Sequence, residues 1–191
     1  MTASETATRL MDAAQLLIME RGYNAFSYKD LAESVGIRTA SIHYHFPSKG
    51  DLGLAVMGRY LGQLDDALAR IDRTAKSGKA RIKGLVKVFA ETESRGAICM
   101  CGSLAASLET LPAELQEAVA EYLDRCETWI QRVIADGGRE GEFAYAGKPA
   151  EAAAALLSGL QGGLLVARAR TARASVLANV QRLFLNTLEA A

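Results

Sequence analysis

The sequence has little cysteine and no stretch that resembles a leader for secretion. Only three of its 191 residues are cysteines. An N-terminal basic segment followed by an apolar stretch is missing, so we expect no secretory signal. An odd number of cysteines in such a chain favours free thiols over a disulfide framework. We therefore expect a cytoplasmic protein.

A long uninterrupted hydrophobic run is also absent. The longest weakly polar run, residues 152–167, contains Ser158, Gln161 and three glycines. A helix needs about 20 mainly apolar residues to cross a bilayer. This run is shorter and rich in glycine, so we expect no contact with a membrane.

An excess of charge of either sign is lacking as well. The 22 lysines and arginines balance 22 aspartates and glutamates, and residues 1–50 are balanced in the same way. Net charge therefore gives no reason to expect a nucleic acid as partner. Any DNA-binding surface has to come from the local placement of cations.

Histidine, which is common in catalytic and metal sites, is scarce. The two histidines, His43 and His45, stand at i and i+2 of an expected helix, which places them on different faces. They are therefore not expected to share a metal ion. No nucleophile, base and orienting group occur at a plausible spacing for catalysis. The sequence favours neither an enzyme nor a cofactor-binding protein.

Apolar residues recur at helical spacing along nearly the whole chain, which predicts an all-α fold. The first helix should end at Gly22, because glycine adopts the left-handed conformation that follows many helices. The later helices are expected over 27–36, 39–46, 48–71, 80–95, 102–110, 112–137, 149–170 and 175–189. Ser27 with Asp30, and Ser48 with Asp51, have the spacing of a capping box, and Thr39 is a suitable N-cap.

The second and third expected helices have the pattern of a helix-turn-helix. Leu31, Ala32 and Val35 form an inward face, Gly36 gives the turn, and Ile37 and Ile42 anchor the second helix from inside. The outward positions of this second helix carry four polar side chains that can hydrogen-bond to base edges: Arg38, Thr39, Ser41 and His43.

At these residues the chain resembles the TetR family of bacterial transcriptional regulators. The resemblance is carried by the segments 26–32 (FSYKDLA), 35–37 (VGI) and 41–52 (SIHYHFPSKGDL), about a quarter of the chain. Within them, the run Tyr-His-Phe-Pro-Ser-Lys is highly specific to the family. The chain departs from many members at Ala40, where they have glycine, and at His43, and both departures bear on base preference.

The resemblance implies an N-terminal three-helix DNA-binding domain, residues 1–50, and a larger helical domain for effector binding and dimerisation, residues 51–191. It implies that double-stranded DNA with a pseudo-palindromic operator and a small-molecule effector are the partners. Bases would be read by Arg38, Thr39, Ser41 and His43. The DNA backbone or neighbouring bases would be contacted by Ser27, Lys29, Tyr44, His45 and Lys49. For Tyr44 the alternative is a core position.

The second half contains candidates for effector recognition. Phe89, Tyr122 and Trp129 are either core residues or part of an apolar cavity, and the sequence does not separate the two roles. Cys99 and Cys101 are either small buried residues or a thiol sensor, because a cysteine at a helix N-terminus can be reactive. The segment 101–105 resembles a motif of a TetR subgroup with electrophile-responsive members.

The last two expected helices carry more apolar surface than one core requires. Their apolar residues are Ala153, Leu156, Leu157, Leu160, Leu164, Leu165, Val176, Leu177, Val180, Leu183, Phe184 and Leu188. Gly159 and Gly163 fall on one helix face and would allow a partner helix to approach closely. We expect a homodimer through these helices, as the resemblance also implies.

These observations predict a DNA-binding regulator, most simply a repressor that a small molecule, electrophile or oxidant releases from its operator. An enzyme is the first alternative class. A helical interaction module that has lost DNA binding is the second.

Overall fold

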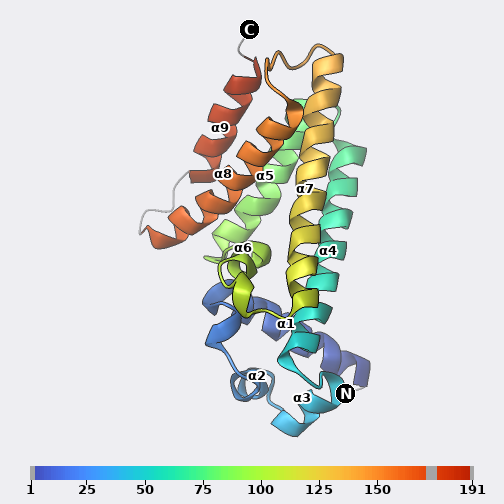
Figure 1. The fold of residues 1–191 in the computed structure, drawn as a ribbon, viewed down its shortest axis with the longest axis vertical. Coiled ribbons are helices and arrows are strands. Elements are labelled where there is room, and N and C mark those ends of the chain that lie inside the picture. The colour runs from blue at the N-terminus through green and yellow to red at the C-terminus, as the bar shows by residue number, and fades with distance from the viewer. Residues whose placement is uncertain (1–2, 171–175, 190–191) are drawn as a thin grey trace. The chain divides into compact units, whose positions relative to one another are not determined.

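In the computed structural model, residues 3–170 and 176–189 are described, and these residues form helices and no strand (Figure 1). The all-α prediction is confirmed. The elements are α1 (Ala3–Arg21), η1 (Tyr23–Ala25), α2 (Tyr28–Val35), α3 (Thr39–His45), α4 (Lys49–Thr74), α5 (Gly78–Ser94), α6 (Met100–Ala105), η2 (Leu108–Thr110), α7 (Ala113–Arg139), α8 (Pro149–Ala169) and α9 (Val176–Glu189).

The helices group into two compact units. The first comprises Met1–Gly62 and Met100–Tyr122, and the second Gln63–Cys99 and Leu123–Ala191. The chain passes between the units along α4 and α7, because each of these helices has residues in both. This grouping by compactness is not a division by function, so the domains 1–50 and 51–191 stay a prediction.

Most helix ends lie within three residues of the sequence-based expectation. The capping boxes of Ser27 and Ser48 form as predicted. Thr39, predicted as the N-cap of the third helix, is instead its first helical residue. The N-cap position is occupied by Arg38, whose side chain makes no capping hydrogen bond. Residues 102–110 do not form one helix but α6 and η2. The predicted start of the last helix at Ser175 lies outside the described residues.

The core of the first unit lies where α1 packs against α2, α3 and α6. Leu10 of α1, Leu31 of α2 and Ile42 of α3 are fully buried there. The apolar face of α1 thus supports both helices of the predicted DNA-binding motif, since neither short helix buries enough surface alone.

In the second unit α5, α8 and α9 pack side by side (Figure 1). By length and composition α8 could cross a membrane, a test that core helices of soluble proteins also pass. Eight residues of α8 are buried within the protein: Ala152, Ala153, Leu156, Leu157, Leu160, Gly163, Leu164 and Ala167. This burial accounts for its apolar character.

Candidate nucleic-acid interface

The start of α2 is fixed by a reciprocal cap. The backbone N–H of Ser27 donates to Asp30 Oδ2 at 2.7 Å, and the Ser27 hydroxyl donates to the same oxygen at 2.6 Å. These hydrogen bonds, the side-chain one foremost, lower the pKa of the Asp30 carboxyl. At the other end Gly36 has φ +74°, which allows the sharp turn into α3. The Ser27 hydroxyl is therefore engaged in the cap before any partner binds.

Tyr28 ties α2 to the end of α3. Its hydroxyl lies 2.9 Å from the carbonyl oxygen of Phe46 and 2.5 Å from that of Ser48, and its single hydrogen can be donated to one of them at a time. Burial, followed by the negative charge of Asp51, raises the pKa of Tyr28 to about 12. The phenol therefore keeps its hydrogen and remains a donor at physiological pH.

Lys49, predicted to contact the DNA backbone, points toward its own protein. Its Nζ donates to the carbonyl oxygens of Tyr23 and Phe26, each at 2.5 Å. The same ammonium lies 4.6 Å and 4.1 Å from the centroids of the two aromatic rings. Burial lowers the pKa of Lys49. In this conformation the charge of Lys49 fastens the start of α4 to the connection between α1 and α2.

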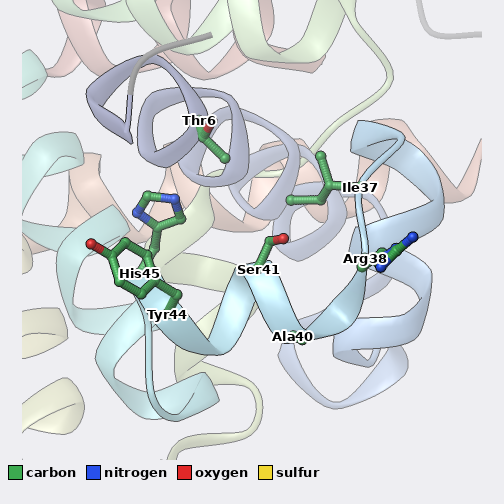
Figure 2. Close-up of a pocket in the computed structure, with 7 residues that line it drawn as sticks. All are labelled: Thr6, Ile37, Arg38, Ala40, Ser41, Tyr44 and His45. Atoms are coloured by element: carbon green, nitrogen blue, oxygen red, sulfur yellow. The ribbon is translucent and has the colours of Figure 1, made fainter.

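The outward face of α3 is polar and exposed. Arg38, Ser41 and Tyr44 are exposed, and Tyr44 is 80% accessible, which rules out its alternative as a core residue. Together with His45, Ala40 and Ile37 they line a hollow of about 600 Å³. Figure 2 shows Thr6 of α1 across this hollow from Ser41. Sequence reasoning missed Thr6, because nothing in the motif links a residue of α1 to this face.

The two histidines of α3 have separate surroundings. His43 is exposed, with its ring edge-on to Tyr28, whereas the half-exposed His45 ring packs against Tyr44 at 5.2 Å between centroids. Of the remaining predicted residues, Lys29 is exposed in the first turn of α2 and Thr39 is half-exposed. The structure thus gathers the predicted base-reading residues on α3 and at its N-cap, Arg38, and leaves Lys29 on the neighbouring helix.

The predicted effector residues do not share one compact unit. Phe89 and Trp129 are buried in the second unit, and the indole Nε1 of Trp129 donates a hydrogen bond to the Asp72 carboxylate at 3.1 Å. Tyr122 is buried in the first unit, stacked on Tyr60 with 5.0 Å between centroids. The second unit also has a hollow of about 300 Å³ beside the end of α7, lined by Ile134, Ala135, Gly138, Arg139, Phe143, Tyr145, Gly147 and Pro149.

All three thiols are buried. Cys99 and Cys101 are 2% and 0% exposed, and Cys101 Sγ lies 3.8 Å from the sulfur of Met57. Burial raises the pKa of Cys126 to about 12. Reactive cysteines are partly exposed, so this burial favours the interpretation of Cys99 and Cys101 as packing residues.

The glycines of α8 correct one expectation about the dimer. A Cβ at Gly163 would meet Leu177 at 2.8 Å, and one at Gly159 would meet Val180 at 3.2 Å. Both glycines therefore allow α9 of the same chain to pack closely against α8, and they do not face a partner helix. A Cβ at Gly162 would meet nothing within 4 Å. The exposed residues of α8 are Glu151, Ala155, Ser158, Leu165, Val166, Arg168 and Ala169.

Known proteins share both the motif and the fold. A family model described as bacterial regulatory proteins, tetR family, matches residues 10–56. A TetR-family regulator from Agrobacterium tumefaciens is 26% identical with a TM-score of 0.94, covering 99% of this chain and 100% of that chain. A TetR transcriptional regulator from Legionella pneumophila is 30% identical with a TM-score of 0.86, covering 95% and 96%.

Curated relatives agree with these structures. The transcriptional repressor KstR2 of Mycolicibacterium smegmatis is 27% identical over 74% of this chain and 71% of its own length. Several other curated relatives are matched over a shorter stretch, 39% of their length. The helix-turn-helix built by α2 and α3, and the similarity to the Legionella regulator over nearly the full chain, lead to one conclusion: this chain belongs to the TetR family of bacterial transcriptional regulators, which are DNA-binding proteins and not enzymes.

Proposed function

We propose that the chain is a repressor that binds a pseudo-palindromic operator as a homodimer and leaves it when a small apolar effector binds. The observation that carries this proposal is the exposed polar face of α3, held by a buried scaffold. Ile42 is fully buried beneath this face, whereas Arg38, Ser41 and Tyr44 are exposed on it and His43 is exposed at another side of the helix. A rigid helix with polar outward side chains suits the major groove.

The roles of the site residues follow from their chemistry. Arg38 can donate two hydrogen bonds to guanine, and Thr39 and Ser41 can donate or accept. Tyr44 and His45 line the same hollow as Arg38 and Ser41, and Lys29 is exposed on α2. All three suit contacts with the phosphate backbone. Ser27 and Lys49 support the site through the contacts that they make within the chain.

The effector is proposed to bind in the part of the chain from 51 to 191. An apolar molecule is favoured over an electrophile or oxidant, because the thiols of Cys99 and Cys101 are shielded from solvent. Phe89, Tyr122 and Trp129 remain candidates for contact with the effector, in the helical part of the protein that the family uses for ligands. The regulator is proposed to act in the cytoplasm, where its DNA lies.

The dimer is proposed to form through α8 and α9, related by a two-fold axis. Leu165 and Val166 of α8 are 49% and 42% exposed, and Leu183 of α9 is 63% exposed. Large apolar side chains exposed together mark a surface for a partner. A two-fold dimer presents two copies of α3 to two half-sites, which explains a pseudo-palindromic operator.

A gel-shift experiment with the DNA upstream of its own gene tests the DNA-binding function. We expect a retarded complex that survives an excess of random duplex and is lost when Ser41 and Arg38 are both replaced by alanine. If the protein forms dimers but no duplex, specific or random, is retarded in the gel, the alternative applies: a helical interaction module that does not bind DNA.

A further inference from the structure

His43 lies on the exposed side of α3, and its ring is held on two sides. Its Nδ1 lies 3.1 Å from the carbonyl oxygen of Pro47, and the ring packs edge-on against Tyr28 with 4.9 Å between centroids. Tyr28 is itself fixed by its hydroxyl contacts with the carbonyls of Phe46 and Ser48. The imidazole is therefore oriented before any partner binds.

The contact with Pro47 decides which nitrogen of the ring carries the hydrogen. A carbonyl oxygen can only accept a hydrogen bond, so Nδ1 must be the donor. In the neutral imidazole one nitrogen donates and the other accepts, which leaves Nε2 as an acceptor. Nε2 has no hydrogen-bond partner among the residues that the structure describes, and the side chain is exposed.

An acceptor on this helix distinguishes the bases of DNA. In the major groove the hydrogen-bond donors are the amino groups of adenine and cytosine, whereas guanine N7 and O6 and thymine O4 are acceptors. We propose that His43 is a specificity-determining residue, whose Nε2 accepts a hydrogen bond from the amino group of an adenine or a cytosine in each half-site. This inference rests on the proposed function of α3.

The neighbouring residue Ser41 makes no such distinction. A serine hydroxyl carries one donor and two acceptor positions and rotates to suit its partner. It can therefore face either an amino or a keto group. Because the two side chains lie on the same short helix, Ser41→Ala is the matched control for changes at His43.

The tautomer can be tested on the free protein by nuclear magnetic resonance. Long-range proton–nitrogen correlations of the two ¹⁵N-labelled histidines, assigned with the His43→Phe variant, report which nitrogen is protonated. At a pH where the ring is neutral, we expect hydrogen on Nδ1 of His43 and none on Nε2. A predominant Nε2–H tautomer would overturn the inference.

The base preference can be tested with duplexes selected from a random library by the unmodified protein. We expect one position in each half-site to prefer adenine or cytosine and to lose this preference in His43→Phe, which keeps an aromatic ring next to Tyr28. Replacing that base by its analogue without the amino group (purine or 2-pyrimidinone) should weaken binding by about 3- to 10-fold. The same base replacement should not change the DNA affinity of His43→Phe, and it should weaken DNA binding by Ser41→Ala as much as it weakens binding by the unmodified protein.

Two results separate this inference from the function beneath it. Suppose that the protein binds specifically, but that His43→Phe changes the preference for guanine or thymine, or changes no preference. This result would overturn the role of His43 and leave DNA binding intact. The absence of any preferred duplex for the unmodified protein would overturn the proposed function itself.

Discussion

Lys29 and Lys49 differ in their surroundings, although both were expected at the DNA backbone. Lys29 is exposed in the first turn of α2. The Lys49 ammonium is held by two backbone carbonyls and two aromatic rings. A charge already paired within the protein contributes to its stability, whereas a free charge near phosphates displaces counterions from DNA.

We expect Lys49→Met to lower the free energy of unfolding by about 2 kcal/mol, since hydrogen bonds to a charged group are lost. Lys29→Met should leave stability unchanged and reduce the salt dependence of DNA binding by about one unit of slope per protomer. Thermal unfolding and binding titrations at several salt concentrations measure the two effects. If Lys49→Met instead reduces the salt dependence of DNA binding and leaves stability unchanged, Lys49 contacts the DNA backbone and does not stabilise the fold.

The thiols make a second prediction at this scale. Burial raises the pKa of Cys126 to about 12, so at pH 8 this thiol is far less ionised than an ordinary cysteine. Cys99 and Cys101 are shielded by burial. We expect the native protein to resist iodoacetamide under conditions in which the urea-unfolded chain is labelled three times, as read by mass spectrometry. Rapid labelling of Cys99 or Cys101 in the native protein would contradict this expectation and support their interpretation as a thiol sensor.

At the scale of the helices, the loop between α7 and α8 holds the start of α5. The Glu142 carboxylate accepts hydrogen bonds from the backbone N–H of Gly78 at 2.6 Å and of Lys79 at 2.9 Å. Burial by itself raises the pKa of Glu142, but these hydrogen bonds outweigh it, so the pKa lies below its ordinary value of 4.5. The ionised carboxylate also compensates the positive end of the helix.

Glu142→Gln should destabilise the protein by about 1 kcal/mol at pH 7, the usual cost of a lost cap. A group whose pKa is lowered on folding stabilises the protein above its ordinary pKa, and this contribution is lost as the pH falls below about 4.5 through the lowered value. The difference between Glu142→Gln and the unmodified protein should therefore shrink in acid. Urea unfolding at several pH values measures it, with the exposed Glu140→Gln as control. A difference independent of pH would contradict the role of the charge.

At the scale of the whole molecule, adjacent glycines of α8 separate dimerisation from folding. Gly162→Trp places a large side chain on the exposed face, where a partner helix is proposed to pack. We expect a folded protomer whose dimer dissociation constant rises about tenfold or more, with a parallel loss of DNA affinity. Light scattering and gel shift measure these effects.

The comparison variant is Gly163→Ala, whose new methyl group would lie 2.8 Å from Leu177. It should lower the stability of the protomer itself, seen by circular dichroism. If Gly162→Trp remains dimeric with full DNA affinity, the partner surface does not include this face. An unmodified protein that is monomeric at micromolar concentration would exclude the dimer altogether.

The sequence by itself determined the local structure of the DNA-binding motif. The capping boxes at Ser27 and Ser48, the left-handed Gly36 and the buried Ile42 all appear where the sequence predicts them. These features depend on residues three or four positions apart, or on one residue's own backbone preference, so a short window of sequence contains their cause. The family could be identified from the same window.

Only the tertiary structure decided where side chains meet partners from distant segments. Lys49 finds its carbonyls more than 20 positions earlier in the chain, Gly163 faces α9 of its own chain, and Tyr28 orients His43 across the turn. Helical periodicity gives the direction of a side chain relative to its own helix but not which helix lies opposite it. That choice depends on how all the helices pack together, and it decides whether a polar residue supports the fold or remains available to DNA.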